Sequence, residues 1–271
     1  MKKSLPLISF GILFVCITAF LVFAFLKNDS PKVTLGGVVP HHNLAEIKID
    51  EFWKEVSETA KPKTIFLVGP DHFNLAKAPT VITKNQNVFP DYTKLEQETL
   101  TKMSSLGVVE DDSIFINEHS IQIHVPYVYR YFPEAKIVPI LFRSDTTLEE
   151  VIELTKNIRP FLSQETIVIA SVDFSHYLSV EEARERDEVS IKALKTFDYE
   201  TLSHFGPDNA DSDQSLIFML EMVCPSHDCA WEELFHGNST DFEPANPFET
   251  TSYFSLFLKN HGNYLLGPLF K

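Results

Sequence analysis

The sequence predicts a single α/β domain with a mostly parallel central sheet flanked by helices, preceded by an N-terminal transmembrane helix. Short apolar, β-branched runs alternate with longer amphipathic stretches, which is typical of βαβ units. A long uncharged segment stands at the N-terminus, and 44% of the 271 residues are hydrophobic, enough for one well-buried core. We therefore divide the chain into a membrane anchor with a short linker, residues 1–32, and an α/β domain, residues 33–271.

The N-terminal segment predicts location. Residues 5–26 contain no charged side chain and are long enough to cross the hydrocarbon core as a helix. A cleaved signal peptide is the alternative, although no small-residue cleavage site follows the segment. Lys2 and Lys3 precede it and place the N-terminus in the cytoplasm. The expectation is a single-pass membrane protein with an extracytoplasmic domain.

The remainder alternates between two kinds of pattern. Apolar runs predict strands, and stretches with helical periodicity lie between them. Strands are expected at 34–39, 64–69, 136–142, 166–172 and 252–258, and helices at 45–60, 93–105, 120–131, 148–162, 180–197 and 213–223.

Charge and cysteine content limit the partners and the cross-links. The net charge of −15 disfavours binding to phosphate backbones, so no nucleic-acid partner is expected. Cys224 and Cys229 are spaced to close a small disulfide loop. A metal clip that adds His227, or two unlinked thiols, are the alternatives.

Histidines and aspartates follow three of the predicted strands. His41 and His42 end the first, Asp71 and His72 end the second, and residues 173–176 (Asp-Phe-Ser-His) follow the strand at 166–172. The carboxyl ends of parallel strands share one crevice, so these side chains are expected to meet there. Imidazoles can ligate a metal or transfer protons. Any one of them could instead be a loop residue; Asp71 could cap a helix and Asp173 could orient an imidazole.

A further histidine-bearing stretch follows residue 117. Glu118 and His119 stand at the start of a predicted helix, and His124 lies one turn beyond Ser120. This stretch could provide acid–base or substrate-anchoring groups. The alternative is a capping arrangement with His124 packed in the core.

Five motifs in order carry a resemblance. Taken together they resemble the Memo family, also called AmmeMemoRadiSam system protein B, whose fold is similar to that of LigB-type class III extradiol dioxygenases. The resemblance spans residues 36–258. It implies that His41 and His72 bind the metal and that Asp173, His176 and His119 line the same pocket. In such a site we expect His176 or His119 to be the catalytic base or acid, assisted by Asp173. The motifs are Val39-Pro40-His41, residues 67–72 (LVGPDH), residues 118–126 (EHSIQIHVP), residues 137–141 (IVPIL) and residues 170–176 (ASVDFSH).

The third metal ligand departs from the family pattern. Memo-like proteins can place a cysteine just before the final strand, where this chain has the stretch 236–243. The related dioxygenases supply a carboxylate in this role, so Asp241 is the candidate third ligand and Glu243 is the fallback. Two histidines and one carboxylate favour Fe(II), with zinc or copper as alternatives. Substrate-binding side chains are expected from His42, Asp71, Glu118 and His124.

The function that follows is a metal-dependent redox or dioxygenase-like enzyme of unknown substrate. The main alternative is a non-catalytic binding module that uses the same pocket to recognise a small molecule, a peptide or a partner protein. The resemblance alone suggests a partner in a radical SAM system. A third interpretation treats the histidines as remnants in a structural domain.

Overall fold

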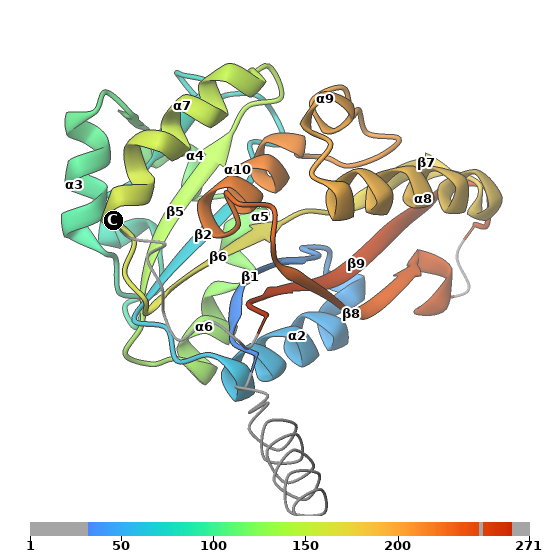
Figure 1. Cartoon of the computed structure of the whole chain (residues 1–271), viewed down its shortest axis with the longest axis horizontal. Coiled ribbons are helices and arrows are strands. Elements are labelled where there is room, and N and C mark those ends of the chain that lie inside the picture. Colours follow the sequence, from blue (N-terminus) through green and yellow to red (C-terminus); the bar gives the residue numbers. More distant parts are fainter. Residues whose placement is uncertain (1–31, 244–245, 262–271) are drawn as a thin grey trace, which may run out of the picture.

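One mixed sheet organises the domain. The computed structural model describes residues 32–243 and 246–261. Within these ranges nine strands form a sheet in the order β4-β3-β5-β2-β6-β1-β9-β7, with β8 paired to β9 (Figure 1). The strands are β1 (Thr34–Val39), β2 (Thr64–Pro70), β3 (Thr80–Ile82), β4 (Val109–Glu110), β5 (Lys136–Phe142), β6 (Thr166–Ser171), β7 (Phe174–Leu178), β8 (Ala230–Asn238) and β9 (Thr250–Lys259).

The centre of the sheet is parallel and its flanks are largely antiparallel. Strands β5, β2, β6 and β1 run parallel, and Ala170 of β6 pairs with both Val38 and Val68. Strand β9 is antiparallel to β1, β7 and β8, and β3 is antiparallel to β5. The prediction of a mostly parallel sheet therefore describes the four central strands, and the whole sheet is mixed.

Helices cover both faces of the sheet (Figure 1). Helix α10 and its neighbour α7 lie on one face, where α10 contacts β1, β2 and β6. Helix α2 contacts β1, β9 and α6, and α5 contacts β2. The helices are α2 (Glu46–Thr59), α3 (Gln97–Ser105), α4 (Asp112–Phe115), α5 (His119–Gln122), α6 (Val125–Tyr131), α7 (Leu148–Ile158), α8 (Val180–Thr196), α9 (Tyr199–Leu202) and α10 (Asp213–Val223).

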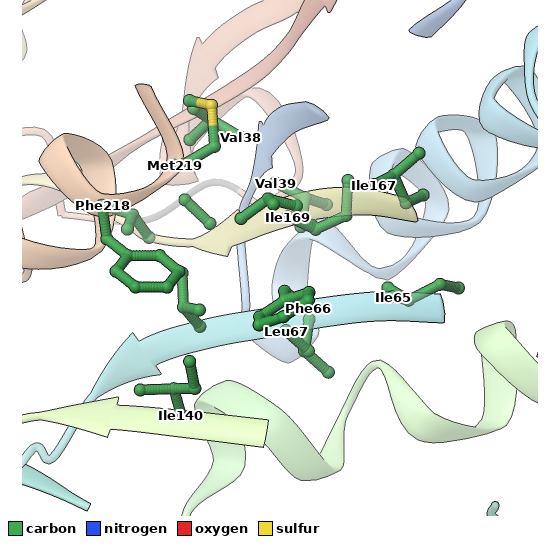
Figure 2. Packing of buried hydrophobic residues seen from close by; sticks show 14 of the residues in the cluster. Val38, Val39, Ile65, Phe66, Leu67, Ile140, Ile167, Ile169, Phe218 and Met219 are labelled. Atoms are coloured by element: carbon green, nitrogen blue, oxygen red, sulfur yellow. The ribbon is translucent and has the colours of Figure 1, made fainter. Parts of the chain in front are cut away.

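The core lies between the central strands and α10. Figure 2 shows side chains of β1, β2, β5 and β6 packed with Phe218 and Met219 of α10. Helix α10 is apolar along most of its length, and Leu216 to Leu220 are all buried. The ring of Phe66 lies 6.5 Å from that of Phe218, which ties the strand that leads to His72 to this helix. A helix apolar on all sides is expected only where neighbours cover it fully.

All five predicted strands are confirmed, and the helical predictions hold with one division. The helix predicted at 120–131 is two short helices, α5 and α6, because His124 caps α6 and Pro126 stands in its first turn. Proline is favoured there because it lacks the N–H that a helix start leaves unpaired. Strands β3, β4, β7 and β8 were not predicted.

The predicted membrane anchor is not retained. Across the part of the chain that the structure describes, no helix combines the length and apolar character that crossing a bilayer requires. The fold prediction is corrected on this point, together with the membrane as a partner and the single-pass, extracytoplasmic placement. Residues 5–26, on which these predictions were based, lie outside the described residues.

The disulfide prediction is confirmed. Cys224 and Cys229 are bonded, with their Cα atoms 6.2 Å apart, and close the loop that follows α10. The metal clip is thereby excluded, since both thiols are consumed. The His227 ring instead stacks on Phe197 at 4.5 Å between ring centroids.

Candidate metal centre

Three adjacent strands deliver side chains to one place. Strands β1, β2 and β6 are neighbours in parallel register, and His41, His72 and Asp173 each lie two residues beyond their last residues. The Nε2 atoms of His41 and His72 are 3.1 Å apart. An oxygen of Asp173 lies 3.7 Å from His41 Nε2. The predicted convergence at the carboxyl ends of the strands is confirmed for these three residues.

Asp211 completes the group and was not predicted. It lies just before α10, and its Oδ2 atom is 3.1 Å from His41 Nε2 and 3.7 Å from His72 Nε2. Its backbone N–H donates to the carbonyl oxygen of Asp173 at 3.1 Å, which joins the two acidic segments. Its other oxygen, Oδ1, is buried without a hydrogen-bond partner among the described residues.

These atoms fit a metal ion. Two overlapping sets have ligand atoms that all lie within 4.8 Å of one another: His41, His72 and His119, and His41, Asp173 and Asp211. Nitrogen and oxygen ligands bind zinc at about 2.0 to 2.2 Å, so two ligands of one ion lie at most about 4.4 Å apart. The separations of 3.1 and 3.7 Å among His41, His72 and Asp211 satisfy this limit.

Glu118 orients His72. Its Oε1 lies 2.7 Å from His72 Nδ1, and its two oxygens also accept from the backbone N–H groups of His72 at 3.2 Å and Ser120 at 3.0 Å. An ionised carboxylate can only accept, so the Nδ1 proton of His72 points to Glu118. His72 Nε2 therefore faces the centre, as is usual for a metal-binding histidine backed by a carboxylate.

The centre favours positive charge. Burial alone lowers the pKa of His72, but its hydrogen bonds to Asp211 and Glu118 and their charges outweigh burial and raise it to about 10. The pKa of His41 is also raised: burial opposes the shift, and Asp173 and Asp211 produce it. Burial and the neighbouring His41 and His72 lower the pKa of His119 to about 4. Protons or a divalent cation can neutralise the carboxylates here.

His119 lines the open side of the centre. Its side chain is 51% exposed, and its ring stacks on that of His72 with 4.1 Å between centroids. Its ring also lies 5.1 Å from that of His41. At neutral pH the lowered pKa leaves His119 uncharged, so one ring nitrogen is available to accept a proton.

Two buried polar atoms near Asp173 have no hydrogen-bond partner among the described residues. They are Nδ1 of His176 on β7 and the hydroxyl of Tyr253 on β9. Burial, and then the charge of Asp173, raises the pKa of Tyr253. Tyr253 was not predicted, because a tyrosine within an apolar strand is indistinguishable in sequence from a core residue.

The other predicted substrate-binding residues lie around the centre in different roles. His42 is exposed and caps the short helical turn at 43–45, where its Nδ1 accepts from Leu44 N–H. Asp71 is buried and accepts from the N–H groups of Phe73 and Ala76, so it shapes the turn after β2. His124 is fully buried in the core.

Asp241 is not brought to the centre. It is exposed, and its carboxylate accepts from the backbone N–H of Asn238 at 2.8 Å in a capping box. Glu243 is exposed on the same segment. Asp211 occupies the place beside His41 and His72 for which Asp241 was predicted.

Fold and site together define an α/β protein with a histidine–carboxylate centre at the carboxyl ends of its parallel strands. The chain belongs to the Memo family: the family model described as Memo-like protein matches residues 23–212. The resemblance to this family that the motifs indicated is thereby confirmed.

Curated relatives agree with this assignment. The chain is 29% identical over 179 residues to a MEMO1 family protein of Methanopyrus kandleri, a match that covers 63% of each chain. It is 32% identical over 175 residues to a MEMO1 family protein of Pyrobaculum aerophilum, covering 60% of this chain and 61% of the relative. The matches thus span less than two thirds of the length of these relatives.

A solved structure shares the fold. The crystal structure of an uncharacterized protein of Escherichia coli K12 superposes with a TM-score of 0.53 at 14% identity, covering 83% of this chain and 98% of that one. At this identity the likeness concerns the fold alone.

Proposed function

We propose that this Memo family protein binds a divalent metal ion through His41, His72 and Asp211 and acts as a metal-dependent redox or dioxygenase-like enzyme on a small organic molecule. One observation carries the proposal: His41 Nε2, His72 Nε2 and Asp211 Oδ2 lie within 3.1 to 3.7 Å of one another. Oδ1 of Asp211 is buried and has no hydrogen-bond partner within residues 32–243 and 246–261, which supports the proposal because buried polar atoms are almost always satisfied.

The ligand set favours Fe(II). Two histidines and one carboxylate are the set used by non-haem Fe(II) oxygenases, and zinc and copper accept the same ligand types. When bound, such an ion would polarise a substrate oxygen and, if it is iron, support oxygen-dependent redox chemistry.

The surrounding side chains would divide the remaining tasks. His119 is neutral at pH 7 and stacks on His72, so its free ring nitrogen can accept a hydrogen bond from a hydroxyl group held at the centre. Asp173 accepts the backbone N–H of His41 at 3.0 Å and fixes the segment that follows β1. His176 and Tyr253 would bind polar atoms of the substrate through the ring nitrogen and the hydroxyl that have no partner in the described part of the chain.

Metal analysis tests the proposal. The full chain is loaded with Fe(II) without oxygen, and bound metal is measured in the wild type and in the His41→Ala plus His72→Ala variant. We expect stoichiometric metal in the wild type and a loss in the double variant. Unchanged metal in the double variant would refute the centre.

A matched pair of variants assigns the carboxylate ligand. Asp211→Asn is expected to weaken metal binding, whereas Asp241→Asn makes the same chemical change at a carboxylate that caps the turn at Asn238 and should not. Oxygen uptake by the iron-loaded protein, screened with small phenols, then tests catalysis. Metal binding without any turnover would favour a non-catalytic module that recognises a small molecule or peptide.

A further inference from the structure

A line of buried hydrogen-bonding groups runs from the core to the rear edge of His41. Trp53 Nε1 lies 3.2 Å from His124 Nδ1, His124 Nε2 lies 3.0 Å from Ser171 Oγ, and this hydroxyl lies 3.1 Å from His41 Nδ1. Trp53, His124 and Ser171 are 0% exposed and His41 is 2% exposed. The four side chains come from α2, the start of α6, the end of β6 and the segment after β1.

The direction of the first two hydrogen bonds follows from chemistry. An indole nitrogen can only donate, so His124 Nδ1 must accept from Trp53. Burial keeps His124 neutral by lowering its pKa well below the ordinary value. Its one ring proton therefore lies on Nε2 and is donated to the hydroxyl oxygen of Ser171. Trp53 thus fixes the tautomer of His124. As a result, one lone pair of the Ser171 hydroxyl oxygen accepts the hydrogen bond from His124 Nε2.

The final link reaches a proposed metal ligand. The hydroxyl of Ser171 still has a proton and a second lone pair, so it can pair with His41 Nδ1 in either protonation state of that atom. This contact opposes rotation of the His41 ring about its Cβ–Cγ bond. With Nδ1 held at the rear, Nε2 points toward His72 and Asp211.

We infer that Ser171, held by His124 and Trp53, is a positioning residue that orients His41 for cation binding. This inference rests on the proposed function. An apolar side chain in place of His124 would fill the same space, although the indole N–H of Trp53 would then lack a hydrogen-bond partner. Packing alone therefore does not require a histidine here. A fully connected polar line rigidifies the groups it joins, and this line ends at the centre.

One variant with a matched control tests the inference. Ser171→Ala removes the hydroxyl that joins His124 to His41. Ser255→Ala makes the same truncation at another fully buried serine, whose hydroxyl has no hydrogen-bond partner among the described residues. Affinity for Zn²⁺ is measured by competition with a chromophoric chelator. We expect Ser171→Ala to bind Zn²⁺ about 10- to 100-fold more weakly, as for other groups that orient metal ligands, and Ser255→Ala to match the wild type.

Histidine nitrogen NMR provides a readout that packing would not change. In the wild type the His124 ring proton is expected on Nε2, and in Trp53→Phe, which keeps an aromatic ring but lacks the donor, His124 is expected to populate both tautomers. A wild-type proton on Nδ1, or an unchanged single tautomer in Trp53→Phe, would overturn the directed line.

The outcomes separate this inference from the proposed function. Equal Zn²⁺ affinities for Ser171→Ala and Ser255→Ala, with loss of Zn²⁺ in the His41→Ala plus His72→Ala variant, would overturn the positioning role and leave the centre intact. Retained Zn²⁺ in that double variant would instead overturn the centre itself. If Ser171→Ala does not fold, His124→Leu replaces it, and an affinity equal to that of the wild type would again overturn the inference.

Discussion

Replacing Glu118 by glutamine should weaken metal binding while leaving the fold intact. Glu118 is 3% exposed and accepts hydrogen bonds from His72 Nδ1 and from the backbone N–H groups of His72 and Ser120. Glutamine keeps the shape but removes the charge and turns one oxygen into a donor that faces these donors. Loss of a charged hydrogen bond costs about 1.5 to 3 kcal/mol, and loss of a ligand-orienting partner lowers metal affinity about 10- to 100-fold.

The same change should alter the pH dependence of stability in the metal-free protein. A histidine whose pKa is higher in the folded state contributes stability that is fully present below its unfolded pKa and is lost as the pH rises through the folded one. For His72 this window runs from the ordinary value of 6.5 to about 10. Without the charge of Glu118 the folded pKa falls, so the variant should lose less stability across this window.

Zn²⁺ competition at fixed pH and urea unfolding between pH 6 and pH 10 measure the two effects. Glu98→Gln is the matched control, because Glu98 is exposed and pairs with Lys102 in its own helix. A Glu118→Gln variant that binds Zn²⁺ as tightly as Glu98→Gln, with unchanged circular dichroism, would refute the reasoning.

Three further predictions concern stability, each measured by urea unfolding. The unfolded chain takes up a proton at His124 that the buried native imidazole, with its pKa held well below the ordinary value, does not. Wild-type stability should therefore fall below about pH 6.5 with a contribution approaching 1.4 kcal/mol per pH unit; His124→Gln should show a shallower fall, and equal slopes would contradict this. Gly69→Ala should cost about 1 to 3 kcal/mol, because the new Cβ would lie 2.7 Å from Ser120 Oγ and 2.9 Å from its Cβ; a neutral effect would show that α5 yields easily. Reducing the Cys224–Cys229 disulfide should remove about 2 kcal/mol, as loop-closure entropy gives for so short a loop, and an unchanged midpoint would contradict that account.

The central strands were predictable because both of their faces are covered. Residues 65–68 of β2 are all buried, so the sequence there is continuously apolar and is bounded by Thr64 and by Gly69-Pro70. Strand β8 lies beside β9 and exposes Glu232, Glu233 and Leu234, so it lacks such a run. Strand β3 has three residues, too few for a periodic signal.

The two histidines and Asp173 were predictable at this centre, and Asp211 was not. His41 and His72 directly follow recognisable strands, and topology alone brings such positions together. Asp211 precedes a helix, where an acidic residue is ordinary because it suits the helix N-terminus. Asp241 looked equivalent in sequence, yet its backbone geometry commits it to Asn238. Only the packing of α10 against the sheet shows that Asp211, and not Asp241, lies beside the two histidines.

That packing holds α10 with its N-terminal end beside His41 and His72 and its length inside the apolar interior. Phe218 and Met219 are both fully buried and fix the position of α10 along the strands. They thereby influence where the Asp211 carboxylate lies relative to the two imidazoles. If the proposed centre binds a metal, its affinity and selectivity should depend on methyl-sized volume changes nearly two helical turns away. Under the proposed function, hydrophobic substitutions in α10 would change the metal preference while every ligand stays the same.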